Sequence, residues 1–357
     1  MITGNKGEWS EVYTLLKIIA DRQLYAGDSN LNKIETLIFP IIKVLREESD
    51  GTYEFSYDND LVFIRGNGEE FRVPIIHFQK HTISLLAKLQ KETCATFSIP
   101  EIETFINSFN CRSIKAKSSI KSDIRIVIHD QRTGTNPELG FSIKSQLGSP
   151  STLLNAGKTT NLIYKINTNL SEEQINAINS IDTKSKIKDR LKGIFNYGNF
   201  LDFIKPESSI FENNLALIDS CLPRIIAEIV LLFFTSDFSK ISDLVTEITH
   251  KNPLNYNLEN NHPFYEYKIK RLLTDIALGM MPATVWKGEL DATGGYLIVK
   301  ENGDILCYHI YNRNEFEDYL FYNTKLETAS TTRHNFGTIY KENEETFFKL
   351  NLQIRFL

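Results

Sequence analysis

The chain has 357 residues, of which 41% are apolar; this is typical of globular proteins that bury a core, and it excludes a mainly disordered chain. Its longest apolar run, at 225–234, is too short to span a bilayer, and the first residues lack an apolar signal core, so we expect a cytoplasmic protein without a membrane partner. The four cysteines lie far apart and form no CxxC pair, so the sequence signals neither a zinc knuckle nor a disulfide framework, and we expect reduced, mostly buried thiols.

The distribution of charge is more informative than the net charge of −5. Basic residues gather at 111–123 (CRSIKAKSSIKSD) and at 183–193 (TKSKIKDRLKG). Local basic stretches on an acidic protein suit an enzyme that must contact DNA and then release it. Solvated helix faces and loops would produce the same pattern, so these stretches alone do not decide the function.

The amino-terminal third is predicted to begin with a helix and continue with strands. Trp9, Val12, Leu16 and Ile19 recur at helical spacing, which predicts a helix over 8–25. Turn signals at Asp50-Gly51 and Asp58-Asn59 then separate three predicted strands. These strands and the two helices predicted after them span 41–49, 52–57, 60–66, 81–92 and 99–109.

The middle and end of the chain alternate between strands and helices. The segments 123–130 and 139–145 predict two strands joined by a loop rich in turn formers, followed by a short helix after Pro150. A strand over 161–167, a mainly helical region over 171–280 and a return to strands from 293 complete the pattern, and Asn302-Gly303 signals a tight hairpin. We therefore predict a mixed α/β protein with a boundary near 200–215.

A lysine stands in the middle of the second of these strands, GFSIKSQLGSP at 140–150. Strand alternation places Ser142, Lys144 and Gln146 on one face. If this strand pairs antiparallel with the one that Asp123 opens, the carboxylate of Asp123 and the ammonium of Lys144 meet at one sheet edge.

Such a pair suits metal-dependent cleavage of a phosphodiester. A carboxylate can bind a divalent cation, which polarises the phosphate and lowers the pKa of a bound water, while a lysine orients that water or offsets developing charge. Mg²⁺ fits because it takes few protein carboxylates and keeps water and phosphate oxygens as its other ligands. The alternative is an ordinary strand lysine whose ammonium reaches solvent.

Asp123 followed by Ser142-x-Lys144 resembles the catalytic core of the PD-(D/E)xK nuclease superfamily, with serine in place of the usual second acid. The surrounding segments SDIRIVIHDQRTG and LGFSIKSQLGSPSTLLNAGKTTN, the block from 319 to the end, and the amino-terminal KGEWSEVYTLLKI together resemble type II restriction endonucleases of the HpaII family. This resemblance runs through most of the chain.

The resemblance implies a fold and an activity. The fold is a mixed-sheet PD-(D/E)xK core flanked by helices (α/β, or α+β) over 1–205, with an amino-terminal helix and an inserted β/helical segment. A helical and then β-rich region over 206–357 is expected to serve DNA recognition and dimerisation. The activity is cleavage of double-stranded DNA at CCGG after the first cytosine, with Mg²⁺ and with sensitivity to cytosine methylation. A cognate methyltransferase would act on the same site without binding this chain.

The serine at 142 departs from the superfamily pattern, because a hydroxyl cannot replace a carboxylate as a metal ligand of equal charge. Some relatives take the second acid from an amino-terminal helix, and Gly7 to Glu11 resembles their GxxxE pattern, so Glu11 is preferred to Glu8 as the second metal ligand beside Asp123. Either glutamate could instead favour the helix dipole. Gln146 could hold a water or be a plain strand residue, and the carbonyl of Ile143 could also bind the metal.

Asp130, at the other end of the strand that Asp123 opens, is the alternative metal ligand. An aspartate before a Thr-Gly loop is more often a turn residue. Asp123 is preferred largely because of the family resemblance. Cys307 and His309 share a strand face without an obvious third ligand, and we expect both to be structural.

A palindromic site implies a two-fold dimer in which each half-site meets the same residues. Arginine or lysine reads guanine in the major groove, and the polar stretch 324–334 combines cations, an acid and hydroxyls. A second stretch, 149–161, directly follows the lysine strand, where the amino terminus of the predicted short helix would bind the DNA backbone. The DNA-binding candidates are Lys325, Thr332 and Arg333 in the first stretch and Ser149, Asn155 and Lys158 in the second.

Two other functions remain open on the sequence alone. The missing second acid would suit a catalytically silent DNA-binding protein on a nuclease-like fold, and Ser142 is the feature that separates it from an active nuclease. A repair or recombination nuclease that recognises DNA structure would share the same residues, and only cleavage at a defined base sequence would separate it from a restriction enzyme.

Overall fold

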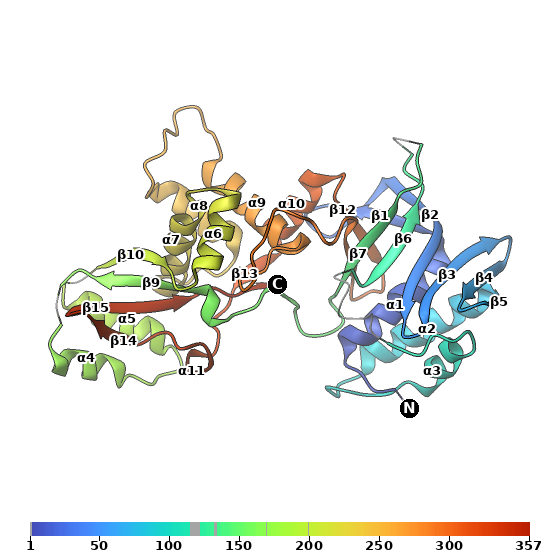
Figure 1. Cartoon of the computed structure of the whole chain (residues 1–357), viewed down its shortest axis with the longest axis horizontal. Coiled ribbons are helices and arrows are strands. Elements are labelled where there is room, and N and C mark those ends of the chain that lie inside the picture. Colours follow the sequence, from blue (N-terminus) through green and yellow to red (C-terminus); the bar gives the residue numbers. More distant parts are fainter. Residues whose placement is uncertain (1, 115–121, 132–133, 169, 199) are drawn as a thin grey trace. The chain divides into compact units, whose positions relative to one another are not determined.

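A computed structural model describes residues 2–114, 122–131, 134–168, 170–198 and 200–357. The chain forms two compact units, coloured along the sequence in Figure 1. Unit 1 comprises Met1–Ser151 and Leu290–Tyr319, and unit 2 comprises Thr152–Glu289 and Leu320–Leu357. The division therefore does not follow the boundary predicted near 205, because the segment from 290 returns to the sheet of unit 1.

The described residues of unit 1 build one nine-stranded sheet in the order β1-β12-β11-β7-β6-β2-β3-β4-β5. Its strands are β1 (Gln23–Gly27), β2 (Lys33–Glu48), β3 (Gly51–Asp58), β4 (Leu61–Gly66), β5 (Glu69–Pro74), β6 (Ile124–Ile128), β7 (Glu138–Ser145), β11 (Gly295–Val299) and β12 (Ile305–His309). Its helices are α1 (Lys6–Asp21), α2 (Ile75–Lys91) and α3 (Pro100–Asn107), and α10 (Arg313–Tyr322) crosses the unit boundary.

The pairing of β7 decides where the lysine strand lies. β6 and β7 are antiparallel, with Ile124 opposite Phe141, as the sequence predicted. On its other side β7 pairs in parallel with β11, with Tyr296 opposite Ser142. β11 begins at Gly295, whose φ of 104° disfavours any L side chain and where a Cβ would come 2.1 Å from the carbonyl oxygen of Tyr308. β11 and β12 form the predicted hairpin.

One face of the sheet carries the core of unit 1. Trp9 and Leu16 of α1 pack in the same buried cluster as Val44, Ile126 and Phe141 of the strands. α1 begins at a capping box, in which the Asn5 side chain accepts from the Glu8 backbone N–H and the Glu8 carboxylate accepts from the Asn5 N–H. The burial of a full helix face explains why the helix predicted here is found.

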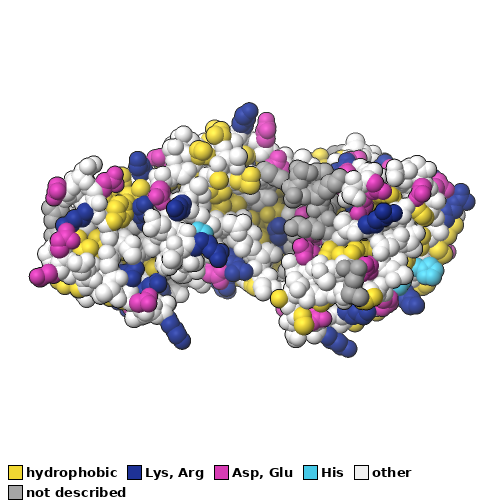
Figure 2. Space-filling model, turned by 60° about the horizontal axis from the view of Figure 1, so that its bottom comes forward, with side chains coloured by type: hydrophobic (Ala, Val, Ile, Leu, Met, Phe, Trp, Pro, Cys, Tyr) yellow, Lys and Arg dark blue, Asp and Glu magenta, His cyan; other side chains and the backbone are white. Residues whose placement is uncertain are grey.

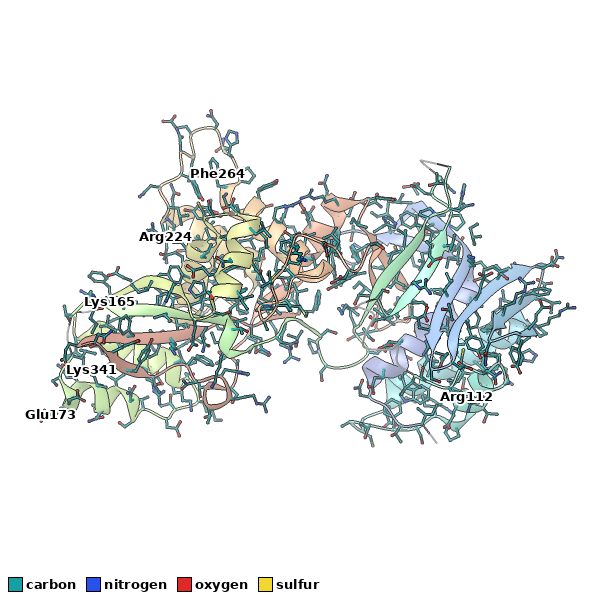
Figure 3. The ribbon with its side chains drawn as sticks, in the orientation of Figure 1. Arg112, Lys165, Glu173, Arg224, Phe264 and Lys341 are labelled. Carbon is teal, nitrogen blue, oxygen red and sulfur yellow. The ribbon has the colours of Figure 1, made fainter. Side chains whose placement is uncertain are left out.

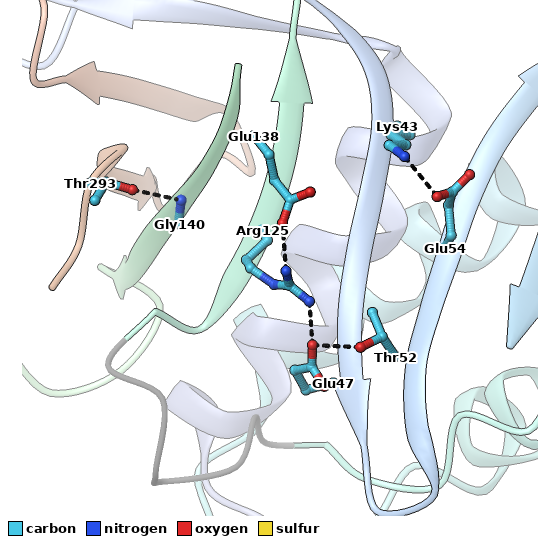
Figure 4. Close-up of polar contacts among 8 residues, drawn as sticks. All are labelled: Lys43, Glu47, Thr52, Glu54, Arg125, Glu138, Gly140 and Thr293. Carbon is cyan, nitrogen blue, oxygen red and sulfur yellow. Dashed lines mark hydrogen bonds and ion pairs between the residues drawn. The ribbon is translucent and has the colours of Figure 1, made fainter. Parts of the chain in front are cut away.

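On the other face of β6, Arg125 alternates with the core residues Ile124 and Ile126. Figure 4 shows Arg125 donating to Glu138 of β7 at 2.5 Å and pairing with Glu47 of β2, which also accepts from Thr52 at 2.7 Å. These contacts tie β6 to both of its neighbours. Gly140 N–H donates to Thr293 Oγ1 at 3.4 Å, which links β7 to the segment entering β11.

Unit 2 combines helices with two smaller sheets in its described residues. The helices are η1 (Lys158–Thr160), α4 (Glu172–Asn179), α5 (Lys186–Asn196), α6 (Ser209–Ile218), α7 (Leu222–Thr235), α8 (Ile241–Lys251), α9 (Phe264–Leu278) and α11 (Thr331–His334). One sheet has the order β10-β9-β15-β14, from Leu201–Pro206, Asn161–Ile166, Glu345–Asn351 and Ile339–Glu342. The other has the order β13-β16-β8, from Thr324–Leu326, Ile354–Phe356 and Thr152–Leu154.

Ion pairs fasten the ends of the first of these sheets, where Figure 3 labels Lys165 and Lys341. Lys165 of β9 pairs with Glu345 of β15 at 2.5 Å, and Lys341 of β14 pairs with Glu172 at the start of α4. The helix α4 is thereby fixed to the strand beside it.

The mixed α/β class is confirmed, whereas the helix predicted after Pro150 is wrong. That segment is the strand β8, because Leu154 pairs with Ile354 at the far end of the chain. The region 171–280 is mainly helical, as predicted, and also contains β10, which pairs with β9. The error after Pro150 comes from a pairing partner distant in sequence. None of the helices in the described part of the chain has the length and apolar character needed to cross a bilayer.

Candidate active site

Asp123 lies at the start of β6, where the strand meets β7. Its backbone N–H donates to the carbonyl of Phe141 at 2.8 Å. Its Oδ2 accepts from the backbone N–H of Ile143 at 2.7 Å and from the hydroxyl of Ser142 at 3.2 Å. Two hydrogen bonds to one oxygen fix the orientation of the carboxylate.

Lys144 reaches Asp123 through Ser142. The ammonium of Lys144 donates to Ser142 Oγ at 3.0 Å, and that hydroxyl donates in turn to Asp123. Ser142 is 8% exposed, so this chain of three groups lies at the edge of the protein interior. Burial lowers the pKa of Lys144 from its ordinary value of 10.5, while Asp123 and then Glu11 oppose that shift. The antiparallel pairing of β6 and β7 thus brings together the lysine and aspartate that the sequence singled out.

The two candidate glutamates of α1 have different surroundings. Glu8 completes the capping box, since its Oε2 accepts from the N–H of Asn5 at 2.9 Å. Glu11 lines a cleft of about 890 Å³ together with Ile143 and Ser145 of β7, and its charge acts on Lys144. A hydrogen bond of 2.8 Å between the hydroxyls of Ser10 and Ser145 holds this part of α1 against β7. The preference for Glu11 therefore gains a physical reason, because Glu8 already caps the helix.

The remaining candidates lie around the same strands. The backbone N–H of Gln146 donates to the carbonyl of Val299 at 2.8 Å and so extends the pairing of β7 with β11, while the role of its side chain stays a prediction. Asp130 lies in a turn beyond β6, where its N–H donates to the carbonyl of Thr135 at 3.0 Å and its carbonyl accepts from Gly134. Cys307 and His309 are buried, and burial lowers the pKa of His309 to about 4.

The donor set near Lys144 is compatible with a hard divalent cation. Within the described ranges, no group of three or more His, Cys, Asp or Glu side chains forms a ready metal cage. The charges of Asp123 and Glu11 both act on Lys144. Two carboxylates would suit Mg²⁺, which commonly uses one or two of these while retaining water and phosphate oxygens.

Tyr296 is a neighbour of Lys144 that sequence reasoning missed. The Lys144 ammonium lies 5.1 Å from the centre of the Tyr296 ring, and the tyrosine is 3% exposed. The contact depends on the parallel pairing of β11 with β7. No local pattern in the sequence signals that pairing, so the residue could not have been found from it.

The DNA-binding candidates are divided between the two units. Ser149 is exposed in unit 1 and lines the same cleft as Glu11. Asn155 and Lys158 are exposed in unit 2. The helix predicted beside Lys144 does not form, because that segment is the strand β8. The predicted binding of the DNA backbone at the amino terminus of this helix therefore has no structural basis.

The polar stretch near the carboxy terminus lies in unit 2. Lys325 belongs to β13, and the exposed Thr332 and Arg333 belong to the short helix α11. Thr332 lines a groove of about 420 Å³ whose lining also contains Lys184, Lys186 and Lys188. We call it the basic groove. Its lining consists of Lys184, Ser185, Lys186, Ile187, Lys188, Phe234, Thr328, Ala329, Ser330, Thr331 and Thr332. Two stretches distant in sequence thus build one surface rich in ammonium and hydroxyl groups.

Charge is locally mixed elsewhere on the surface. On the face shown in Figure 2, Lys and Arg side chains are interspersed with Asp and Glu. The other predicted basic stretch, at 111–123, lies largely outside the described residues, because Lys115, Lys117 and Lys121 fall in 115–121.

Comparison with known proteins identifies relatives over nearly the whole chain. The model of the HpaII restriction endonuclease family matches residues 5–356. The chain is 52% identical over 360 residues to the type II restriction enzyme HpaII of Haemophilus parainfluenzae, and the match covers 99% of each protein. No solved structure matches the chain.

Proposed function

The chain belongs to the HpaII restriction endonuclease family and is a type II site-specific deoxyribonuclease. We propose that it hydrolyses DNA at CCGG in a Mg²⁺-dependent reaction whose active site contains Asp123, Ser142 and Lys144. The observation that carries the proposal is the hydrogen-bonded chain from Lys144 through Ser142 to Asp123. It sets an ammonium and an oriented carboxylate side by side at the end of two adjacent strands. A partly buried lysine whose ammonium is held near a carboxylate favours a chemical role.

Each residue has a distinct part in the proposed reaction. Asp123 and Glu11 would hold Mg²⁺, which when bound polarises the scissile phosphate and acidifies a water. Lys144 orients the attacking water and offsets the negative charge that develops on the phosphorane. Ser142 holds the ammonium of Lys144 beside Asp123, so the residue in the position of the usual second acid positions the lysine rather than binding metal.

The basic groove of unit 2 is proposed to contact the DNA backbone. Its lining contains three lysines and several hydroxyls, a composition that suits phosphate oxygens. Lys186 and Lys188 also pair with Asp182 and Asp237, so Lys184 is the lysine best placed to contact a phosphate. Arg333, exposed directly after Thr332 in α11, and Lys325 of β13 are proposed to read guanine O6 and N7. Ser149, Asn155 and Lys158 are proposed as further phosphate contacts. A palindromic site and one set of readers per chain require a homodimer on DNA.

Digestion of a plasmid with purified protein tests the proposed reaction. With Mg²⁺ we expect discrete fragments whose sequenced ends all derive from CCGG, and with EDTA we expect intact DNA. Prior methylation of the cytosines in CCGG should protect the plasmid. Fragments ending at another sequence would refute the proposed specificity, and cleavage that continues in EDTA would refute the metal dependence.

A further inference from the structure

The position of the Lys144 ammonium depends on more than its bond to Ser142. A lysine side chain carries about 2 kcal/mol of rotamer entropy, and one hydrogen bond leaves several of its torsions free. On a strand, such a side chain ordinarily extends its charge toward solvent. Here the Lys144 side chain is partly buried instead, so a neighbouring group covers part of it.

The Tyr296 ring is that neighbour. In the parallel pair β7–β11, Tyr296 stands opposite Ser142 and Ile298 opposite Lys144, so all these side chains share one face of the sheet. The ammonium lies 5.1 Å from the ring centre, within the range of a cation–π contact. Ser142 and Tyr296 therefore hold the same ammonium from two adjacent strands.

The ring is itself immobilised. Tyr296 is 3% exposed, and the Phe316 ring of α10 packs edge-on against it with centres 5.4 Å apart. Burial, and then the nearby charge of Asp123, raise the pKa of the Tyr296 phenol, so it stays neutral. Tyr296 thus contributes an aromatic face to Lys144 and no opposite charge.

We propose that Tyr296 is a positioning residue for DNA cleavage: its ring shields the Lys144 ammonium from water and holds it beside Ser142 and Asp123, aimed at the scissile phosphate. The inference rests on the proposed role of Lys144. Tyr296 itself does not contact the reacting atoms. Its ring, and not its hydroxyl, is the part that acts.

The sequence of the chain offers a matched control in Tyr308. This tyrosine lies opposite Tyr296 on β12 and is 1% exposed, on the same face of the same sheet. Its ring stacks on Tyr319 with centres 4.1 Å apart, and its hydroxyl donates to the Asp28 carbonyl at 2.6 Å. Tyr308→Leu therefore removes a comparable buried ring without removing the ring that faces Lys144.

The test compares Tyr296→Phe, Tyr296→Leu and Tyr308→Leu by single-turnover cleavage of a CCGG duplex at saturating enzyme with Mg²⁺. Binding to the same duplex is measured in EDTA. We expect Tyr296→Leu to cleave about 10- to 30-fold more slowly, the equivalent of one desolvated cation–π contact, with duplex affinity unchanged. Tyr296→Phe should cleave within about threefold of wild type, since it keeps the ring. Tyr308→Leu should match wild type in rate even where its melting temperature falls.

Wild-type rates in Tyr296→Leu, or an equal slowing in Tyr308→Leu, would overturn the inference. If Tyr296→Leu does not fold, Phe316→Leu replaces it, because loss of the edge contact should loosen the ring and slow cleavage without weakening binding. Lys144→Ala separates this inference from the proposed function. If Lys144→Ala cleaves normally, the proposed function fails; if it is inactive while Tyr296→Leu and Phe316→Leu are normal, only the role of Tyr296 fails.

Discussion

Replacing Ser142 with alanine should slow DNA cleavage without weakening DNA binding. The change removes two hydrogen bonds, one of 3.0 Å from the Lys144 ammonium and one of 3.2 Å to Asp123. A hydrogen bond to a charged group contributes about 1.5–3 kcal/mol. Loss of the lysine bond alone therefore predicts a cleavage rate lower by about 10- to 150-fold.

Single-turnover cleavage of a CCGG duplex measures this rate directly, because the observed cleavage rate then does not include product release. Ser142→Thr is the matched control, since it retains the hydroxyl that joins Lys144 to Asp123, and it should cleave much faster than Ser142→Ala. Ser142→Glu should leave the cleavage rate nearly unchanged only if a metal ligand can occupy this position. If Ser142→Ala cleaves at the wild-type rate, the serine does not position the lysine, and the reasoning from these two hydrogen bonds is wrong.

Other predictions concern stability and recognition. Burial lowers the pKa of Lys144, so folding disfavours its protonated form; Lys144→Met should raise the melting temperature near neutral pH, and this gain should shrink as pH rises toward 10.5, as thermal melts across pH will show. Arg46 and Glu48 form an ion pair 2% and 1% exposed, so Arg46→Met should lower the free energy of unfolding in urea by about 3–5 kcal/mol. Arg65→Met removes an exposed ion pair with Glu70 and should lower the free energy of unfolding by less than about 1 kcal/mol. Equal losses of unfolding free energy in Arg46→Met and Arg65→Met would contradict this expectation. Arg333→Ala should weaken CCGG binding by about 1–3 kcal/mol and reduce discrimination against altered sites, as titration with matched and mismatched duplexes will show. Lys184→Ala should weaken binding to all duplexes equally. It should also reduce the slope of log affinity against log salt concentration by about the amount that corresponds to one phosphate contact. Lys192→Ala, outside the basic groove, should change neither quantity.

The sequence predicted those features of the site that depend on neighbouring segments. Strand alternation and the turn-rich loop between β6 and β7 were enough to place Asp123 beside Lys144, because a hairpin-like pair needs no distant partner. The preference for Glu11 came from a family pattern, and the structure adds that Glu8 is engaged in the cap of α1.

What the sequence did not predict depends on pairings between distant segments. β11 joins the sheet of unit 1 beside β7, which brings Tyr296 to Lys144 and moves the division of the chain away from 205. In the same way, the segment after Pro150 has a composition compatible with a helix start, and only its pairing with β16 makes it a strand. Local propensity cannot anticipate either outcome, since the energy comes from burial and from strand pairing across the fold.

The most direct test of the proposed active site compares wild type with Lys144→Ala on one CCGG duplex while Mg²⁺ is titrated. Duplex binding by both proteins is measured in EDTA, so that a loss of cleavage can be separated from a loss of binding. We predict equal binding, Mg²⁺-dependent cleavage by the wild type and no detectable cleavage by Lys144→Ala. Mg²⁺-dependent cleavage by Lys144→Ala at the wild-type rate would contradict the assignment and place the chemistry at other residues.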